Sequence, residues 1–266
     1  MLYILLPAYN EEESIDFIFP KLKHYFENEY LIDYKIIICN DGSKDKTLDK
    51  INKYVDTIPI EVINHKINRG LGETARDLFE RVAELANEGD IIIRLDCDDT
   101  HEPSSIKGLI EKLNEGYDVV IASRFVKGGG QLGLNGYRKI ISRLANYFMK
   151  FFFPIKGLKE YSSGFRAYRA SLIINAINFY GNNFIQLKGL GFTCTLEKII
   201  KLRILKARFG EAPMILRYDQ KKSPSKMISS LTTFGYLTMV LLYYWPWGGW
   251  RSSIGKKHVN WKKSND

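Results

Sequence analysis

Short apolar runs alternate with helical patterns through the first half of the chain, and this alternation constrains the fold more than any other feature. The runs are rich in Ile and Val and nearly unbroken, as expected of buried parallel strands. They cover residues 2–6, 35–39, 60–63, 90–95 and 118–122. Residues 11–27 and 72–87 carry apolar side chains at helical spacing. The alternation predicts βαβ units in a doubly wound α/β sheet, whose ligands bind beyond the carboxyl ends of the strands.

The composition is that of a globular protein with a basic excess. The 266 residues include 45% hydrophobic side chains and carry a net charge of +9 with neutral histidines. The length suits one large α/β domain, with or without an appendage. The charge favours a polyanionic partner, which could be nucleic acid, anionic lipid or a phosphorylated substrate. Three widely spaced cysteines form neither a disulfide framework nor a zinc motif, so we expect reduced, buried thiols.

Two segments of the second half carry patterns typical of membrane contact. Residues 137–153 form a predicted helix with a broad apolar face, and its only charges are positive. That pattern favours a basic amphipathic helix at a membrane surface, although a core-facing helix would share it. Residues 227–250 contain no charged side chain, have basic flanks on both sides and end in an aromatic cluster. We expect a helix or re-entrant hairpin on the cytoplasmic face of a membrane, with a span or a packed soluble helix as alternatives.

The rest of the second half carries weaker patterns. Residues 126–136 are glycine-rich and are predicted to form a mobile loop. Residues 194–205 are expected to be helical, and residues 207–216 to form a final strand. The chain therefore divides into a predicted α/β domain at 1–226 and, at 227–266, a membrane-contacting uncharged segment with a basic tail.

Acidic side chains follow three of the predicted strands at the points where those strands end. Glu11 comes after the first strand, Asp41 after the second, and Asp96, Asp98 and Asp99 after the fourth. One edge of the sheet would thus gather several carboxylates, which is costly without a cation. Mg²⁺ or Mn²⁺, bound by one or two carboxylates and by ligand phosphates, would remove that cost. A helix-capping turn could account for Asp99, but it does not explain Asp96 and Asp98 together.

Motifs for several other chemistries are missing. No phosphate-binding loop of the G-x-x-x-x-G-K-S/T type and no G-x-G-x-x-G follows a predicted strand, and there is no G-x-S-x-G elbow. The absence of the first two motifs argues against P-loop nucleoside triphosphatases and dinucleotide oxidoreductases. The groups available to handle phosphate are a metal ion and arginines.

Four motifs resemble those of glycosyltransferase family 2 of the GT-A fold. They are Leu6-Pro7-Ala8-Tyr9-Asn10-Glu11, Asn40-Asp41-Gly42-Ser43, Asn68-Arg69-Gly70-Leu71-Gly72 and Asp96-Cys97-Asp98-Asp99. Further motifs resemble the polyprenyl-phosphate branch of that family, which includes dolichyl-phosphate mannose synthases. These are Ser123-Arg124-Phe125-Val126-Lys127-Gly128-Gly129, Tyr137-Arg138-Lys139, Ser163-Gly164-Phe165-Arg166 and Ser225-Lys226-Met227. The resemblance reaches to about residue 227 and implies a doubly wound, mixed GT-A sheet followed by a membrane-associated helical segment.

The resemblance implies a nucleotide-sugar donor and a set of residues that bind it. Four residues would hold the base and ribose, namely Pro7, Tyr9, Glu11 and Asp41. Cys39 sits where a strand residue lines the same pocket. One departure is Asn40, where the family often has a second aspartate; we take Asp41 as the ligand contact and expect little loss.

The resemblance also implies how phosphate groups are handled. Asp96 and Asp98 would form the D-x-D pair, with Asp98 the more direct ligand of Mg²⁺ or Mn²⁺. Arg124 and Arg138 would meet the phosphates of the donor and of a polyprenyl phosphate acceptor. Lys226 would close over the donor diphosphate. Mannose synthases often have a glutamine after the D-x-D pair that can join the metal, and the corresponding residue here is Thr100. This departure leaves the identity of the base and of the sugar open.

These implications predict an inverting, metal-dependent transfer of a hexose from a donor such as GDP-mannose or UDP-glucose to polyprenyl or dolichyl phosphate. A phosphate monoester is already anionic near neutral pH, so it needs positioning and no general base. A hydroxyl acceptor would need a base, for which Asp99 and Glu160 are candidates. A saccharide or protein acceptor is therefore the alternative. A nucleic-acid-binding protein is a remote alternative that rests on charge alone, and no nucleic acid is expected as a partner.

Overall fold

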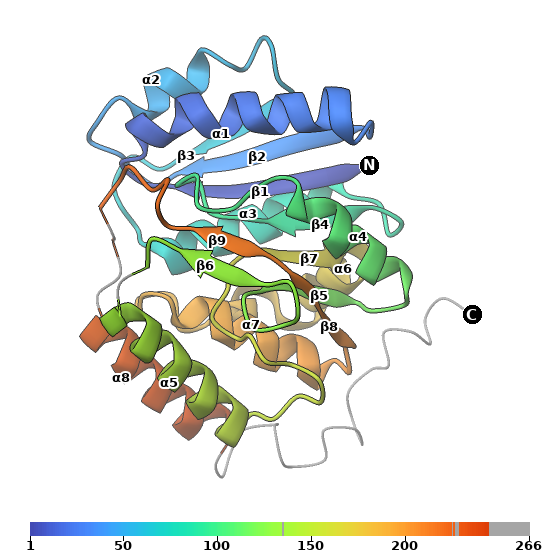
Figure 1. Ribbon diagram of the computed structural model, residues 1–266, viewed down its shortest axis with the longest axis vertical. Coiled ribbons are helices and arrows are strands. Elements are labelled where there is room, and N and C mark those ends of the chain that lie inside the picture. Colours follow the sequence, from blue (N-terminus) through green and yellow to red (C-terminus); the bar gives the residue numbers. More distant parts are fainter. Residues whose placement is uncertain (135, 225, 227–228, 245–266) are drawn as a thin grey trace.

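A seven-stranded mixed sheet runs through the centre of the molecule (Figure 1), in the order β3-β2-β1-β4-β7-β5-β8. Its strands are β1 (Leu2–Ala8), β2 (Tyr34–Asn40), β3 (Ile60–Asn64), β4 (Ile91–Arg94), β5 (Val119–Ser123), β7 (Arg166–Arg169) and β8 (Phe209–Pro213). Neighbouring strands are parallel except where β7 pairs with β4 and β5. The computed structural model describes residues 1–134, 136–224, 226 and 229–244. The mixed sheet and the five strands predicted in the first half are confirmed, whereas the sequence patterns gave no indication of β7.

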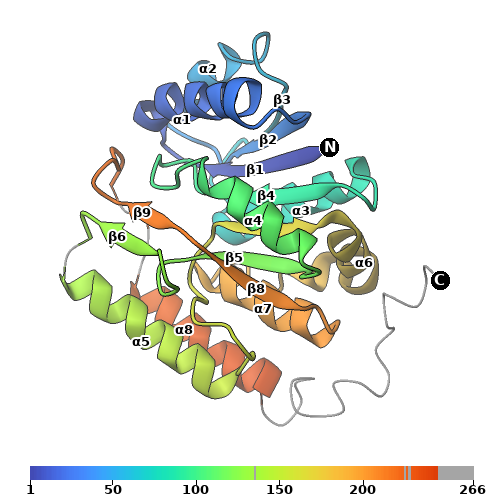
Figure 2. The same cartoon turned by 45° about the vertical axis from the view of Figure 1, so that its right-hand side comes forward.

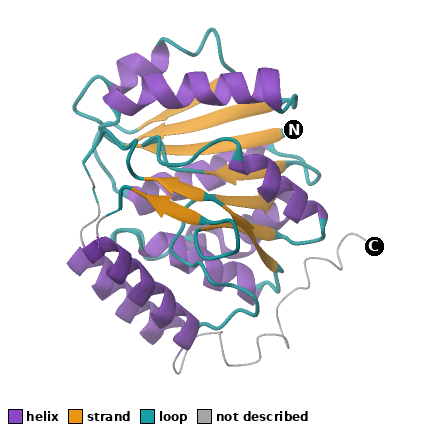
Figure 3. Cartoon of the chain, viewed as in Figure 1, coloured by secondary structure: helices purple, strands orange, loops and turns teal. Residues whose placement is uncertain are grey.

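Helices cover both faces of this sheet (Figures 2 and 3). They are α1 (Glu12–His24), α2 (Thr47–Asn52), α3 (Leu71–Leu85), α4 (Ser105–Asn114), α5 (Gly136–Phe152), α6 (Ala170–Tyr180), α7 (Thr193–Ile204) and α8 (Ser229–Met239). Helices α1, α2 and α4 pack on the face that receives Leu2, Ile4 and Leu6 of β1. Helices α3, α6 and α7 pack on the opposite face with Tyr3 and Leu5. Because both faces are covered, the first-half strands are apolar at nearly every position.

Two predictions for the second half are wrong in part, and both errors concern non-local pairing. The predicted loop 126–136 contains strand β6 (Gly130–Leu132), which pairs with β9 (Ile215–Arg217) in a separate two-stranded sheet. The predicted strand 207–216 is divided between β8 and β9. Proline carries no N–H for a strand ladder, and β8 ends at Pro213. The chain then changes sheets at Met214, whose N–H donates to the Ser123 carbonyl (3.1 Å) while its carbonyl accepts from the Gly130 N–H (2.9 Å).

Helices α5 and α8 lie side by side at one end of the molecule (Figure 1), where the Phe148 and Tyr236 rings are 6.2 Å apart. The helix predicted over 137–153 is confirmed as α5, and its inner side chain Met149 is fully buried. Of the predicted segment 227–250, residues 229–244 form α8 and a short π-helical turn, Val240–Tyr244. Residues 227, 228 and 245–266 lie outside the described residues. Within the described ranges, no helix combines the length and the apolar character required to cross a membrane.

Candidate functional site

The strand order brings the predicted carboxylates to one edge of the sheet. Strands β2, β1 and β4 are neighbours, so the loops that leave their carboxyl ends lie next to one another. These loops carry Asp41, Glu11 and Asp98, respectively. The β6–β9 pair also reaches this edge, because the Arg217 N–H donates to the Thr100 carbonyl at 3.0 Å. The carboxyl edge is therefore an acidic site partly enclosed by the segment that follows β9.

Glu11 is paired with a lysine from the far end of the chain. The Lys226 ammonium contacts the Glu11 carboxylate, and it donates to the Asn10 carbonyl at 3.0 Å. Its Nζ also lies 6.0 Å from the centre of the Tyr9 ring. Glu11 is almost completely buried, and this burial raises the pKa of its carboxyl against the opposing effect of Lys226. Lys226 thus lies beside two of the residues predicted to bind the donor.

The two aspartates of the D-x-D pair have different cationic partners. Asp98 forms an ion pair with Lys221 and accepts a hydrogen bond from the Thr100 hydroxyl at 2.6 Å. Asp96 pairs with the buried Arg94, at 2.7 Å between Oδ1 and Nη1. Burial alone would raise the pKa of Asp96, but Arg94 holds it below the ordinary value.

The donor set of this pair fits a hard divalent cation. Carboxylate and phosphate oxygens are the ligands that Mg²⁺ and Mn²⁺ prefer, and Mg²⁺ usually takes only one or two carboxylates from the protein. The Lys221 ammonium already pairs with Asp98, so this carboxylate is balanced by a positive charge in the structure. Within the described part of the chain, no three His, Cys, Asp or Glu side chains converge as a metal-ligand cluster. A metal at this edge would therefore need ligand phosphates to complete its coordination.

His101, next to the acidic loop, has a structural role. Its Nδ1 accepts a hydrogen bond from the Asp96 backbone N–H at 3.1 Å, and its ring stacks on Phe165 at 5.0 Å between centroids. Burial lowers the pKa of His101, which favours the neutral ring that this acceptor role requires. His101 therefore helps to hold the loop that carries Asp96.

Asp41 makes four hydrogen bonds to one short loop and a histidine. Its Oδ1 accepts from the His65 ring (2.7 Å) and from the Arg69 N–H (2.8 Å). Its Oδ2 accepts from the Gly70 N–H (2.8 Å) and from the Asn68 side-chain amide (3.0 Å). An ionised carboxylate offers about four lone-pair positions, so these bonds use its capacity. Asp41 therefore fixes the Asn68–Gly70 loop at the start of α3.

Gly42 lets the Asn40-Asp41-Gly42-Ser43 turn approach that loop. A Cβ at this position would lie 2.3 Å from the backbone carbon of Ile67, and its φ is +63°. Cys39, just before the turn, is fully buried, and its Sγ lies 3.5 Å from the His65 Nε2. Burial raises the pKa of the Cys39 thiol to about 12. In this structure Cys39 lies behind Asp41 and contributes no surface that a ligand could touch.

Arg124 lies in a nearly buried polar cluster between β5 and α5. Its guanidinium makes a two-point ion pair with Glu160, at 2.8 and 3.0 Å, and Glu160 is fully buried. The same guanidinium donates to Ser142 of α5 and to Ser162, both at 2.9 Å. Gln131 takes a further N–H at 3.3 Å. Of the five N–H groups of an arginine, the contacts among the described residues leave one on Nη1.

Arg138 and Asp99 are two other residues that the sequence singled out, as a phosphate contact and as a candidate general base. Arg138 lies in the first turn of α5, and its side chain is outside the described residues. Asp99 has its carboxylate bound to the Lys21 ammonium, at 2.8 and 3.0 Å. Burial raises the pKa of Asp99, and its backbone adopts a left-handed conformation with φ of 60°.

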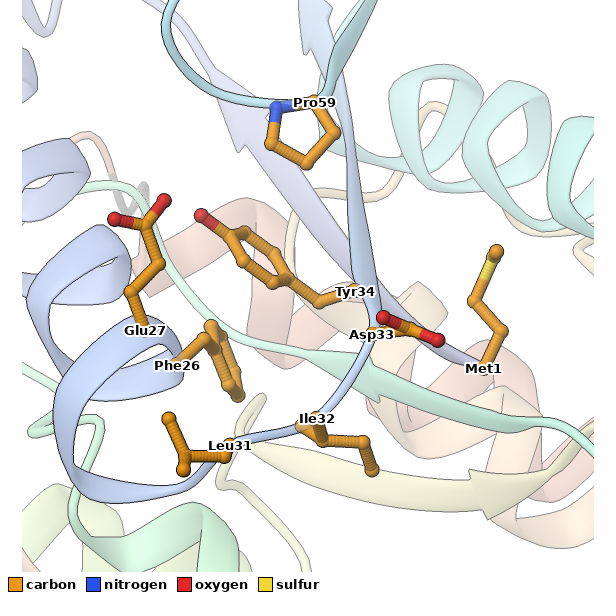
Figure 4. Close-up of a pocket in the computed structure, with 8 residues that line it drawn as sticks. All are labelled: Met1, Phe26, Glu27, Leu31, Ile32, Asp33, Tyr34 and Pro59. Carbon is orange, nitrogen blue, oxygen red and sulfur yellow. The ribbon is translucent and has the colours of Figure 1, made fainter.

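A separate hollow opens at the opposite edge of the sheet (Figure 4), where β1 and β2 begin. Its lining residues are Met1, Phe26, Glu27, Leu31, Ile32, Asp33, Tyr34 and Pro59. None of the predicted site residues lines it, and ligands of doubly wound sheets bind at the other edge. We assign it no role in the chemistry of the carboxyl edge.

Sequence reasoning missed three residues of this site: His65, Asp77 and Lys221. His65 directly follows β3, so the rule that applied to Asp41 and Asp98 could have found it. Lys221 could not have been paired with Asp98 from sequence, because 123 residues separate them.

The fold and the acidic edge define a doubly wound α/β protein with carboxylates gathered at the carboxyl ends of β1, β2 and β4. A comparison with family models makes the class specific: the model of glycosyl transferase family 2 matches residues 3–176. The match covers more than half of the chain, and the chain belongs to this family. The resemblance inferred from the four motifs is thereby confirmed.

Two curated relatives carry names that refer to mannose transfer to dolichol or polyprenol phosphate. A dolichol-phosphate mannosyltransferase of Pyrococcus furiosus is 29% identical over 199 residues, which are 74% of this chain and 52% of that protein. A polyprenol monophosphomannose synthase of Mycolicibacterium smegmatis is 26% identical over 64% of this chain and 62% of that protein. The matched regions therefore span only about half to three-fifths of the length of these relatives.

Solved structures share the fold at low sequence identity. Glucosyl-3-phosphoglycerate synthase of Mycobacterium tuberculosis, in complex with Mn²⁺ and UDP, aligns with a TM-score of 0.60 at 17% identity, over 90% of this chain and 78% of that one. A mannosyltransferase of Pyrobaculum calidifontis, in complex with GDP-mannose and Mn²⁺, aligns with a TM-score of 0.50 at 15% identity, over 85% and 57% of the two chains. The GT-A-like fold predicted from the sequence is confirmed.

Proposed function

We propose that this protein transfers a hexose from a nucleotide-sugar to polyprenyl or dolichyl phosphate at the cytoplasmic face of a membrane. The donor would lie beyond β1, β2 and β4, with its base and ribose near Pro7, Tyr9, Glu11 and Asp41 and its diphosphate near the D-x-D pair. The donor would be a nucleotide-sugar of the GDP-mannose or UDP-glucose type. The three cysteines are buried and free, which suits the reducing compartment where such donors would be used.

One observation carries the choice of acceptor: the Arg124 guanidinium is hydrogen-bonded to Ser142 on α5. Arg124 is a nearly buried cation that follows β5, whereas the outer side of α5 is apolar and basic. A molecule that reaches both places needs an anionic head and an apolar tail. A lipid phosphate has both, and the remaining Nη1–H of Arg124 together with Arg138 would bind its head group.

The two carboxylates that could serve as a general base are already engaged. Asp99 is bound to Lys21, and Glu160 is bound to Arg124 in a fully buried position. A hydroxyl acceptor needs a base to take its proton, but a phosphate monoester with a second pKa of about 6 does not. The occupied carboxylates therefore favour a phosphate acceptor over a saccharide or protein hydroxyl.

The proposed reaction is a single displacement with inversion. An oxygen of the acceptor phosphate forms a bond to the anomeric carbon, the bond from that carbon to the donor diphosphate breaks, and the nucleoside diphosphate leaves with the electron pair. Arg124 and Arg138 would orient the acceptor phosphate. Lys221 and Lys226 lie on the acidic edge and would screen the departing diphosphate. Asp96 and Asp98 would hold Mg²⁺ or Mn²⁺, which supplies Lewis-acid stabilisation of the leaving group when bound.

The direct test of this function is a transfer assay with purified protein. Labelled GDP-mannose or UDP-glucose, Mg²⁺ or Mn²⁺, and a short polyprenyl phosphate are incubated together, and label is measured in the organic phase. We expect lipid-extractable label with one of the donors. Absence of such label with every common hexose donor, in a preparation that still binds nucleotide, contradicts the lipid acceptor.

Helices α5 and α8 present a surface suited to an anionic membrane. Seven large apolar side chains on the two helices and the turn after α8 are between 54% and 76% exposed: Ile140, Leu144, Tyr147, Phe151, Phe234, Leu237 and Leu241. Residues 136–153 contain Lys139, Arg143 and Lys150 and no acidic residue. Exposed apolar area combined with positive charge is the pattern of a helix that lies in a lipid interface. We propose an anionic bilayer surface as the partner of this face.

Replacing two of these side chains should release the protein from vesicles. We expect Leu144→Glu/Phe151→Glu to weaken binding to phosphatidylglycerol-containing vesicles at least about 100-fold, because each buried side chain contributes about 1.5–3 kcal/mol. The control is Phe17→Glu/Leu31→Glu, which changes two exposed apolar residues elsewhere. Sedimentation with vesicles measures the binding. Unchanged sedimentation of the α5 variant, or a loss of self-association in place of lipid binding, contradicts the membrane assignment.

A further inference from the structure

His65 lies between two carboxylates, and its position is unusual for a side chain with no assigned role. Its Nδ1 is 2.7 Å from Asp41 Oδ1, and its Nε2 is 2.8 Å from Asp77 Oδ2. The imidazole is almost completely buried. An ionised carboxylate only accepts hydrogen bonds, so both contacts form together only when both ring nitrogens carry a proton. In this geometry each ring nitrogen is placed to donate to one of the two carboxylates.

Asp77 is in turn held in place by arginines. Arg76 donates to its Oδ1 at 2.6 and 2.9 Å, and the Arg69 guanidinium donates to Oδ2 at 3.1 Å. Burial alone would raise the pKa of Asp77, but Arg76 and His65, followed by Arg69, lower it, so the carboxylate is ionised. The Cys39 thiol also lies beside the ring, 3.5 Å from Nε2.

Asp41 links this pair to the proposed donor site. Its hydrogen bonds from Asn68, Arg69 and Gly70 fix the loop that enters α3. Asp41 Oδ1 has two partners, the Arg69 backbone N–H and the His65 ring. Within the described residues, His65 is the one side chain that bonds to this oxygen. If the ring N–H toward Asp41 were lost, the carboxylate would have a free lone pair and room to rotate away from the loop.

We propose that His65 is a positioning residue for the nucleotide-sugar donor: clamped by Asp77, it fixes Asp41 and through it the Asn68–Gly70 loop. This rests on the proposed function, because it assigns the ordered loop to the donor's nucleotide. The bonds of Asp41 to this loop use its acceptor capacity, so its contribution to donor binding acts through the backbone that it orders. His65 itself touches neither the donor nor the reacting atoms.

Two amide substitutions separate the two contacts of the ring. An asparagine amide at position 65 can replace the Nδ1–H that faces Asp41, whereas the longer glutamine amide replaces the Nε2–H that faces Asp77. We expect His65→Gln to weaken the binding of GDP or UDP, measured with Mn²⁺ by calorimetry, by roughly 10- to 100-fold, the range of one hydrogen bond to a charged group. We expect His65→Asn to stay within about threefold of the natural protein.

The controls distinguish positioning from a general loss of stability. His24→Gln changes an exposed histidine and should leave nucleotide binding unchanged. Nitrogen-15 spectra of the natural protein at neutral pH should show two ring N–H groups on His65. Equal losses of affinity in both variants that follow their losses of Tm, or a single ring N–H, overturn the proposal. If the natural protein binds neither GDP nor UDP, the proposed function fails and this inference fails with it. Normal binding by the natural protein and by His65→Gln contradicts the inference alone.

Discussion

Asp98→Asn should reduce sugar transfer about a thousandfold while leaving the protein folded. The carboxylate faces the proposed diphosphate position, and stabilisation of a leaving group by a metal contributes several kcal/mol, at about 1.4 kcal/mol for each factor of ten. The amide oxygen of asparagine can still accept from the Thr100 hydroxyl, so the loop keeps its local hydrogen bond. Initial rates of label transfer, together with Tm, measure the effect.

Asp219→Asn is the matched control for this substitution. Asp219 is an exposed aspartate of the segment after β9, and its carboxylate pairs with Arg217. It should retain normal transfer. Asp96→Asn is less informative, because it would leave the buried Arg94 without its partner and would combine a stability effect with a catalytic one. Full activity of Asp98→Asn, or full activity of the natural protein with the metal chelated, contradicts the role given to the D-x-D pair.

Glu160→Gln should cause a large loss of stability. The fully buried carboxylate accepts two bonds from Arg124 and one from the Ser162 hydroxyl at 2.7 Å, and backbone N–H groups of Ser162 and Ser163 also point at it. Glutamine would turn an amide donor toward some of these donors and would leave the Arg124 charge buried without a counter-ion. Breaking a buried pair in this way costs about 3–5 kcal/mol. At about 2–4 °C per kcal/mol, Tm should fall by roughly 10 °C.

Glu115→Gln serves as the control, because Glu115 is half-exposed and pairs with Lys112 at the surface. Such a pair contributes about 0–1 kcal/mol, so Tm should change little. Thermal denaturation followed by circular dichroism measures both variants. If the two substitutions shift Tm equally, the Arg124–Glu160 ion pair is solvated and not buried, which contradicts the structure described above.

The parallel part of the fold could be predicted from sequence because its strands are buried on both faces. Strands β1 and β2 bury apolar side chains on both faces of the sheet, so their burial is visible in the sequence as unbroken apolar runs. Strands β6 and β9 have three residues each and pair across some 85 positions of the chain. These strands form because they pair with each other, and no local sequence pattern indicates such pairing. The glycine-rich residues 126–136 were therefore predicted to be a loop. Strand β7 is also short, at four residues, and was hidden for the same reason.

The candidate site divides in a similar way. Glu11, Asp41 and Asp98 could be placed together because each follows a strand, and neighbouring parallel strands end at one edge. The lysines that pair with Glu11 and Asp98 could not be placed from the sequence. Lys221 and Lys226 reach the edge from a segment more than 120 residues away from Asp98, and only the folded chain brings them there. The positions of the carboxylates were therefore predictable from the sequence, whereas the cations that balance them depend on the tertiary fold.

The central claim, transfer of a hexose to a lipid phosphate, is tested most directly by offering two acceptors that differ only in the phosphate. Polyprenyl phosphate and the free polyprenol of the same chain length are supplied in identical anionic vesicles with the labelled donor that the protein uses. We predict lipid-extractable label with the phosphate and none with the alcohol, and a product of inverted anomeric configuration. Transfer to the polyprenol, or transfer only to water-soluble saccharides, would contradict the account.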